Sequence, residues 1–541
     1  MERTCRTYLN RMSYDGAPTP AMAAGNVHRQ RSGGTVDDET DRISELPDDV
    51  LLDILGRVAV AGDHHTVART SALSRRWRSL PWPQIKNVSL DVGNFFLRSD
   101  EWIHVRRRHR FAEQHHATAG FTDALARFLA PTPPSNWVIE RLSLKFILTR
   151  RDYVRRIGDL VGAAAAAGKV KNVELEIVTE MKFLSYDERR TMLGYGARFK
   201  HLMQDCVAAF RSLTKLTLQY LWFHGPAALN DVVRGCGALE FLHVNQCGFI
   251  PDGVQLDDGD GDGGAPPCAL TIDAPRSRLR MLVCNFCYIG HLELVQAPEL
   301  AFVQHRAFFL EDSHPISFGC TPSLQGLSLS HGREEDDDDV KLKLSDLLVN
   351  VGQLQWLSLG FDISKIWVQP EHPKQLGAAL GRLRELHLKN IHPDYDLSWA
   401  TFLLEAAPLL LTLELHIFDH PCSPYWHKKG DWSENVTWQL SPEFRHHHLA
   451  KLSFHRAFHL EKDLPFARLV MELAVNLQSV TFRIKSARCD GCPTTQRKFP
   501  GLAKSRLRFT QGNENADAFV KELKHGIPTS AEITVLFSDS D

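Results

Sequence analysis

Leu354-Gln-Trp-Leu-Ser-Leu359, Leu383-Arg-Glu-Leu-His-Leu388 and Leu410-Leu-Thr-Leu-Glu-Leu415 share one spacing, apolar-x-x-apolar-x-apolar. Alternate residues of a strand point to opposite faces, so the last two apolar positions of each motif lie on one face of a short strand. Such a strand needs a neighbour to complete its core, and the motif therefore predicts strands stacked side by side. The same spacing recurs at Ile139–Leu144, Val170–Leu175, Leu213–Leu218, Leu239–Val244, Leu279–Cys284, Ile289–Leu294, Leu324–Leu329, Leu449–Phe454 and Leu477–Phe482.

The spacing between motifs favours a repeat architecture. Most successive motifs are about 26 to 43 residues apart, near or above the 20 to 29 residues of typical leucine-rich repeats. We expect an α/β fold, an irregular leucine-rich-repeat solenoid in which parallel strands form a horseshoe-shaped sheet. Helices such as 402–407 and 466–473 would cover its convex side. The alternative is an ordinary α/β domain whose strands contain leucine.

The two ends of the chain differ from this repeat. Residues 1–40 are polar with little periodic hydrophobicity, which predicts disorder. The segment from Ile43 to Leu80 has apolar residues at a helical period. Within it, Pro47 suits the first position of a helix and the two acidic residues that follow suit its first turn. At the other end, we expect a helix over 516–524 and a strand over 531–537, which would cap the last repeat.

Composition excludes several classes of protein. The 541 residues carry 63 Lys and Arg against 65 Asp and Glu, so no net field favours nucleic acid or a membrane surface. There is no signal-peptide pattern and no run of about 18 apolar residues. The 11 cysteines are an odd, scattered set, which suits free thiols. We therefore expect a protein of the nucleus or cytoplasm, or both.

Ile43-Ser-Glu-Leu-Pro-Asp-Asp-Val-Leu-Leu-Asp-Ile-Leu-Gly-Arg-Val58 and Arg69-Thr-Ser-Ala-Leu-Ser-Arg-Arg-Trp-Arg-Ser-Leu80 together resemble the F-box of the plant F-box/leucine-rich-repeat/FBD family. Leu270-Thr-Ile-Asp-Ala-Pro275 and Leu294-Val-Gln-Ala-Pro-Glu-Leu300 are similar to the Ala-Pro repeats of that family. Arg468 to Gln478 and Phe519 to Lys524 resemble its C-terminal FBD region. The resemblance covers most of residues 41–541.

This resemblance implies a domain order and a non-catalytic function. The order would be a disordered tail (1–40), an F-box (41–82), a helical connection (83–136), the repeats (137–485) and an FBD-like cap (486–541). The F-box would bind a Skp-type adaptor, and through it cullin and RING subunits, while the repeats bind an unknown target for ubiquitination. A repeat scaffold acting outside a ligase is the alternative. The apolar residues expected to bind the adaptor are Leu46, Pro47, Val50, Leu51, Ile54, Leu55 and Trp77; of these Ile54, Leu55 and Trp77 are also candidates for the core.

Strand alternation also indicates where a target would lie. The residue after the last apolar position of each motif faces the open side of the sheet. In the last four motifs these residues are Lys389, His416, His455 and Arg483, a basic series that suits an acidic or phosphorylated target. The alternative is a merely solvated sheet face.

No catalytic, cofactor or metal site emerges from the sequence. The run 259–264 matches a dinucleotide fingerprint by letters but neither follows a strand nor opens a helix, and a calcium loop starting at Asp258 would have Ala269 in place of its last ligand. Cys284 and Cys287 have zinc-like spacing without a matching pair nearby. For Cys489 and Cys492 a metal or redox role stays open as an alternative.

Overall fold

The computed structural model describes residues 46–60, 66–67, 70, 76–77, 86–96, 107–130, 138–148, 151–179, 189–225, 227–253, 267–308, 314–332, 341–361, 366–392, 395–417, 438–456, 464–485 and 513–538. Contacts divide the chain into two units, residues 1–51 and 52–541. The predicted disordered tail, the run 259–264 and the pair Cys489 and Cys492 lie outside the described residues.

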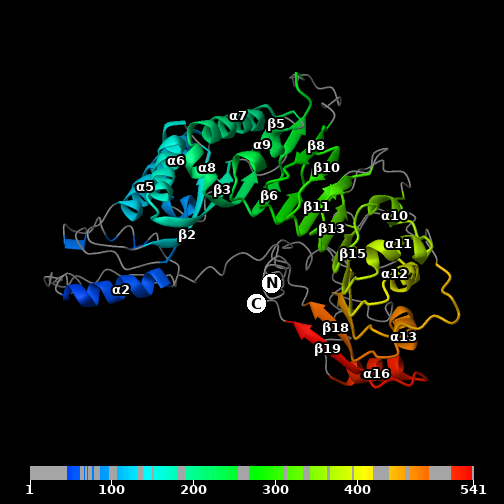
Figure 1. Cartoon of the computed structure of the whole chain (residues 1–541). Coiled ribbons are helices and arrows are strands. Elements are labelled where there is room, and N and C mark those ends of the chain that lie inside the picture. The colour runs from blue at the N-terminus through cyan, green and yellow to red at the C-terminus, as the bar shows by residue number, and fades with distance from the viewer. Residues whose placement is uncertain are drawn as a thin grey trace. The chain divides into compact units, whose positions relative to one another are not determined.

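A 14-stranded sheet forms the centre of the second unit (Figure 1). Every neighbouring pair in it is parallel. In spatial order the strands are β1 (Asn87–Asp91), β2 (Ile139–Ile147), β3 (Val170–Val178), β4 (Leu213–Gln219), β6 (Phe241–Asn245), β9 (Met281–Asn285), β11 (Phe302–Phe308), β13 (Gly326–His331), β14 (Trp356–Gly360), β15 (Glu385–Ile391), β16 (Thr412–Ile417), β17 (Lys451–Arg456), β18 (Ser479–Lys485) and β19 (Glu532–Ser538).

The repeated apolar positions form continuous rows across this sheet. Leu386 of β15 lies opposite Leu357 on one side and Leu413 on the other, and Leu388 is placed in the same way beside Leu359 and Leu415. These side chains are buried, which makes the rows the core of the repeats. The parallel sheet predicted from the motif is confirmed.

Three strands of the sheet lie outside the predicted motifs. Strand β19 corresponds to the separately predicted capping strand, whereas β1 and β11 lie outside the motifs for two other reasons. Strand β1 begins within the segment predicted to be a helical connection, although Ile85-Lys-Asn-Val-Ser-Leu90 has the same spacing as the other motifs. Strand β11 carries His305 in the row where its neighbours place Cys284 and Leu329. A leucine pattern does not detect a repeat whose last core position is a histidine.

One predicted motif belongs to a different sheet. Ile289–Leu294 leads into β10 (His291–Gln296), which pairs in parallel with β8 (Ala269–Asp273) and β12 (Ile316–Cys320) in a three-stranded sheet. Strands β5 (Trp222–His224) and β7 (Gly248–Ile250) form a two-stranded sheet. Strands β8, β10 and β12 thus lie in the connections between β6 and β13, whereas β5 is followed by a helix, α9 (Ala228–Gly235).

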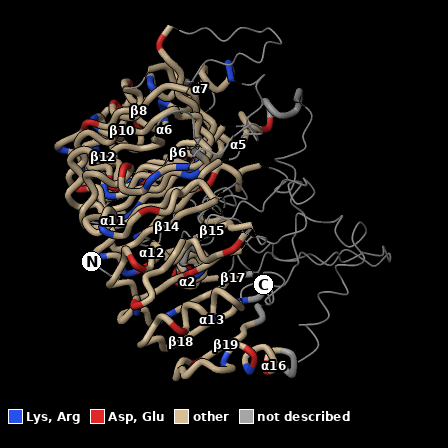
Figure 2. Tube along the Cα trace, turned by 90° about the vertical axis from the view of Figure 1, so that its right-hand side faces the viewer, with Lys and Arg blue, Asp and Glu red and all other residues tan. Residues whose placement is uncertain are grey.

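Helices fill most other connections between strands. Figure 1 shows α10 to α13 along the outer side of the C-terminal strands, and the tube in Figure 2 shows β14 to β19 following one another beside α11, α12 and α13. The helices are α5 (Arg107–Leu129), α6 (Arg151–Ala166), α7 (Arg189–Asp205), α8 (Val207–Arg211), α9 (Ala228–Gly235), α10 (Leu344–Leu347), α11 (Pro373–Leu380), α12 (Thr401–Ala406), α13 (Leu464–Leu473) and α16 (Asn513–Lys524), with 3-10 turns η1 (Val92–Phe95) and η3 (Ser398–Ala400).

The C-terminal elements match the expected positions. Helix α16 and strand β19 correspond to the predicted helix over 516–524 and strand over 531–537. Strand β19 pairs with β18 as the last strand of the sheet, and the ring of Phe519 meets Phe482 edge to face at 5.0 Å. The guanidinium of Arg468 on α13 donates to the carbonyls of Glu522, Leu523 and His525 at the end of α16.

At the N-terminal end, α2 (Asp48–Val60) accounts for the first predicted helical series. The helix begins at Asp48, one residue later than expected: Pro47 precedes it, and the carbonyl of Pro47 accepts the first helical hydrogen bond, from the amide of Leu51 at 3.1 Å. The described residues 66–67, 70 and 76–77 are also helical.

Candidate functional site

The residues predicted to bind an adaptor differ in exposure. On α2, Val50 and Ile54 are one helical turn apart and each is 38% exposed. The guanidinium of Arg57 forms an ion pair with Asp53 at 2.9 Å on the same exposed stretch. Pro47 is exposed and Leu46 half-buried, whereas Leu51, Leu55 and Trp77 are buried. Among the residues predicted to bind the adaptor, the exposed ones are therefore Pro47, Val50 and Ile54.

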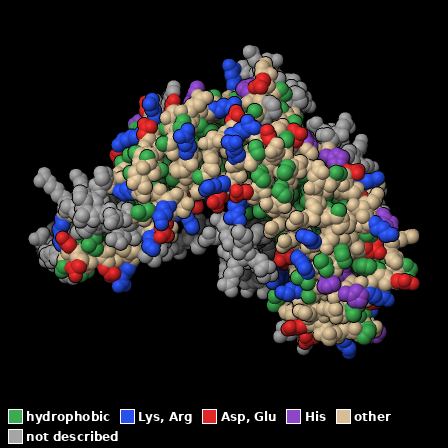
Figure 3. All heavy atoms as spheres, viewed as in Figure 1, with side chains coloured by type: hydrophobic (Ala, Val, Ile, Leu, Met, Phe, Trp, Pro, Cys, Tyr) green, Lys and Arg blue, Asp and Glu red, His purple; other side chains and the backbone are tan. Residues whose placement is uncertain are grey.

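The four residues predicted to face a target lie on the adjacent strands β15 to β18. His416 is directly opposite His455, and His455 is opposite Arg483. The rings of His416 and His455 stack in parallel with centroids 4.2 Å apart. Figure 3 shows His side chains together with Lys and Arg over these C-terminal strands. The structure thus brings residues from separate repeats into one row.

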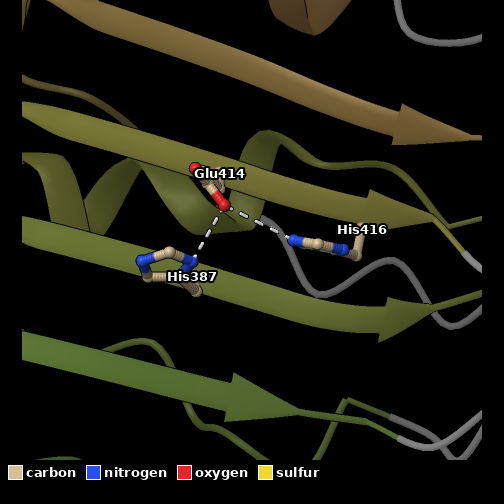
Figure 4. Close-up of side chains that lie close together, drawn as sticks. All are labelled: His387, Glu414 and His416. Carbon is tan, nitrogen blue, oxygen red and sulfur yellow. Dashed lines mark ion pairs between the residues drawn. The ribbon is translucent and has the colours of Figure 1, made fainter. Parts of the chain in front are cut away.

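Two further residues on this face complete a cluster that the sequence reasoning missed. His387 of β15 lies opposite Glu414 of β16, and their Nδ1 and Oε2 atoms are 3.0 Å apart. The same Oε2 lies 3.5 Å from Nε2 of His416 (Figure 4). It also lies 3.9 Å from Nε2 of His455. The sequence could have indicated both residues, because each occupies the position between the last two apolar residues of a motif. Side chains at that position face the same side of the sheet as the predicted row.

Burial and charge act against each other in this cluster. Burial lowers the pKa of His387, but hydrogen bonds with Glu385 and Glu414 outweigh it, and the pKa is raised overall. Burial alone would raise the pKa of the Glu414 carboxyl, yet hydrogen bonds from His387 and His416 hold this pKa well below its usual range. Burial and the charge of Lys389 lower the pKa of His416, although Glu414 opposes them. Glu414 is therefore an anion surrounded by imidazoles.

An aromatic surface continues the face from this cluster toward β11. The ring of His387 meets Trp356 at 5.1 Å, and the ammonium of Lys389 lies 5.8 Å from the centre of the Trp356 ring. Gly326 is opposite both Phe302 and Trp356, whose rings approach to 5.5 Å. A Cβ at Gly326 would crowd the Phe302 ring, so glycine allows the two aromatic rings to meet.

The N-terminal strands present a different electrostatic pattern on the open face. Lys145 lies 3.1 Å from Glu176 and 3.7 Å from Asp91, on the two neighbouring strands. Burial lowers the pKa of Lys145, but the two carboxylates outweigh it and the pKa is raised. Charges here pair across strands, whereas Lys389 and Arg483 add positive charge to an imidazole-rich surface.

The buried cysteines of the middle repeats are part of the core. The thiol of Cys287 donates to the carbonyl of Val244 at 3.4 Å, and the thiol of Cys247 donates to that of Leu218 at 3.6 Å. Burial raises the pKa of Cys247 to about 12. Cys284 and Cys287, which have zinc-like spacing in the sequence, are also buried free thiols. Within the part of the chain that the structure describes, no helix has the length and apolar character to cross a membrane.

Comparison with known proteins identifies relatives in plants. No protein-family model matches the chain. A putative F-box/FBD/LRR-repeat protein of Arabidopsis thaliana is 28% identical over 49% of the chain and 58% of its own length. An Arabidopsis F-box protein is 30% identical over 38% of the chain and 45% of its own length. The meiotic F-box protein MOF of Oryza sativa is 49% identical over 10% of the chain and 11% of its own length.

These alignments bear on the resemblance read from the sequence. The chain spans about half the length of the two Arabidopsis relatives it matches. The name of the first relative carries the F-box, FBD and leucine-rich-repeat descriptions that the sequence motifs had suggested, and the name of the second carries the F-box description alone. Over about half of its length, the chain is a homologue of the plant F-box/FBD/LRR-repeat proteins, as its motifs predicted.

Proposed function

We propose that the chain is the substrate-recognition subunit of an SCF-type E3 ubiquitin ligase. In this function the F-box-like segment binds a Skp-type adaptor, and the repeats hold the target near the ubiquitin-charged enzyme. Holding both partners on one assembly makes transfer nearly intramolecular and raises the effective concentration of the target. The observation that carries the proposal is the F-box-like sequence around α2 in a chain homologous to F-box/FBD/LRR-repeat proteins.

The exposed residues of α2 support the adaptor side. Aliphatic side chains of this size contribute about 1.5 to 3 kcal/mol when fully buried. Val50 and Ile54 are each 38% exposed, so covering them with a partner would add about 0.6 to 1 kcal/mol apiece. Leu51, Leu55 and Trp77 are buried already, and in this proposal they hold α2 in shape.

The open face of β15 to β18 supports the target side. The imidazoles of His416 and His455 and the cations Lys389 and Arg483 share this face with the aromatic ring of Trp356. Such a surface suits a target segment that carries carboxylates or phosphates, because Lys and Arg side chains bind these groups through charge-assisted hydrogen bonds. Replacing Lys389 and Arg483 with glutamate should then weaken target capture without affecting the adaptor.

A pull-down with a Skp-type adaptor tests the proposal. The full chain should retain the adaptor, and the triple variant Leu46→Ala, Pro47→Ala, Val50→Ala should lose most of it. The matched control replaces two exposed apolar residues of the repeats, Leu411→Ala and Val475→Ala, and should bind as the wild type does. Adaptor binding that survives the triple variant would show that the F-box assignment is wrong.

Recovery of cullin separates the ligase from the alternative of a scaffold outside it. A ligase subunit should bring down cullin together with the adaptor, in proportion to adaptor binding across the variants. A scaffold should bind the adaptor without cullin. Copurification of the adaptor alone under conditions in which a known ligase subunit retains cullin would favour the scaffold.

A further inference from the structure

The His387, Glu414 and His416 side chains bring three metal-binding atoms into one small volume. One donor atom from each of these residues lies within 4.8 Å of the other two. Figure 4 shows both imidazoles directed at the carboxylate of Glu414, with separations of 3.0 and 3.5 Å from the same oxygen. In a tetrahedral zinc site with bonds of about 2.1 Å, neighbouring ligand atoms are about 3.4 Å apart. The two separations from the Glu414 oxygen are close to this value.

We propose that His387, Glu414 and His416 form a zinc site on the open face of the sheet. Imidazole nitrogen and carboxylate oxygen are ordinary zinc ligands. Three protein ligands leave one position for water or for a group supplied by a bound partner. The proposal goes beyond adaptor and target binding, because it concerns a metal ion that neither requires.

The backbone fixes the relative positions of the three ligands. His387 and Glu414 are opposite each other in a parallel pair of strands, and His416 follows Glu414 by two residues on the same face. Little ordering of the chain would therefore accompany metal binding. A site built on strands in this way is more rigid than one built on loops.

Neighbouring groups hold the imidazoles in orientation. Nε2 of His387 lies 3.7 Å from the carboxylate of Glu385, so this ring can direct Nδ1 at the metal while Nε2 faces an acid. A carboxylate behind a ligating histidine is the usual second interaction of zinc-bound imidazole. The ring of His416 is held by parallel stacking on His455. Nε2 of His455 lies 3.9 Å from the Glu414 oxygen, farther than the 3.5 Å of His416, so in this site His455 supports His416 without ligating the ion.

An ion-pair network without metal is the rival explanation, and the hydrogen bonding of the cluster argues against it. A single Glu414 oxygen faces three imidazole nitrogens, from His387, His416 and His455. Nε2 of His416 is buried, and its contact with this oxygen, at 3.5 Å, is longer than an ordinary hydrogen bond. A cation among these atoms would satisfy it. Lys389 lies close enough to oppose a further positive charge, so we expect weaker binding than at closed structural zinc sites.

Zinc binding by the metal-free full-length protein tests the site. Equilibrium dialysis with Zn²⁺ should give one bound equivalent that is lost or weakened at least about tenfold in both Glu414→Gln and His416→Gln. Two control variants should bind as the wild type does. His447→Gln removes an exposed histidine outside the cluster, and Cys489→Ser with Cys492→Ser removes the other candidate ligands.

Two measurements on the wild type keep the test decisive if a cluster variant fails to fold. Zn²⁺ should raise the melting temperature of the wild type, because it binds the folded state. Co²⁺ at the site should give visible ligand-field bands without the thiolate charge-transfer band of cysteine ligands. Absence of a bound equivalent in the wild type, or a Co²⁺ spectrum with thiolate bands, overturns the proposal, and so does full retention of zinc in both cluster variants.

Discussion

The stability of the middle repeats should fall in mild acid because of His305. This histidine occupies a core position of β11 between Cys284 and Leu329 and is 1% exposed. Burial, together with the charge of His291, lowers the pKa of His305 to about 4 from its ordinary 6.5. The folded repeat therefore favours neutral His305, whereas the unfolded chain takes up a proton below pH 6.5.

The sign and size of the effect follow from this difference. The stabilising contribution is complete above pH 6.5, decreases as the pH falls, and is fully lost below the folded pKa. One pKa unit corresponds to about 1.4 kcal/mol, so the difference between the unfolded and folded pKa of His305 amounts to about 3 kcal/mol of folding stability. About 2 kcal/mol of this stability is lost by pH 5.

Hydrogen exchange can measure this loss locally, because each repeat of a solenoid contacts only its neighbours. Between pH 7.5 and pH 5, the free energy of opening for amides of β9, β11 and β13 should fall by about 2 kcal/mol more in the wild type than in His305→Leu. Leucine is the matched replacement, since Leu329 holds the equivalent position in the next repeat. His447→Gln, which removes an exposed histidine, should follow the wild type.

The same experiment can refute the reasoning. If the wild type and His305→Leu lose equal protection in these three strands, proton uptake by His305 does not govern their stability. The amides of β15 to β17 provide an internal reference, because the substitution leaves the residues of these strands unchanged.

Three further outcomes are expected. In thermal unfolding, Gly196→Ala on α7 should destabilise the protein by at least about 2 kcal/mol, because the added Cβ would overlap the Trp222 carbonyl. Gly194→Ala on the same helix has open space and should stabilise the protein by about 0.5 to 1 kcal/mol. Equal effects of the two substitutions would contradict the packing of α7. In peptide mapping after alkylation of the native protein, exposed Cys320 should react and buried Cys247 should react only in denaturant, so labelling of Cys247 in the native state would contradict its burial. Arg468→Ala should lower the exchange protection of α16 by about 1 to 2 kcal/mol, since it removes charge-assisted donors to the end of that helix.

The sheet could be predicted from the sequence because its core has a short and strict pattern. All but one of the twelve motifs lie on strands of the 14-stranded sheet, since each strand must bury the same two positions against its neighbours. The exception, Ile289–Leu294, has the right spacing but follows Leu279–Cys284 too closely for a complete repeat. It forms part of the smaller sheet instead. Spacing between motifs therefore carries information that the motif alone lacks.

Residues in the left-handed conformation at the ends of several strands show what the pattern could not predict. Tyr220, Gln246, Phe286, Ala307 and Asn390 have φ between 51° and 59°, and each lies two residues after the last core position of its strand. This conformation favours glycine or asparagine, and only one of the five is asparagine. The repeat geometry imposes this conformation regardless of the local residue, so single-residue preferences could not reveal it.

The candidate site shows how chemistry in a stacked sheet has to be sought across repeats. The row of His416, His455 and Arg483 was predictable because each follows the last apolar residue of its motif, and strand pairing then sets them side by side. His387 and Glu414 occupy the preceding open position, between the last two apolar residues of each motif, where the last four motifs show no series of like residues. In a parallel stack, residues about 30 positions apart in the chain become direct neighbours. The contacts of a histidine in one repeat are therefore predicted from the residue at the same motif position in the next repeat. For this chain the comparison joins His387 to Glu414, which converts two unremarkable strand residues into the centre of the cluster.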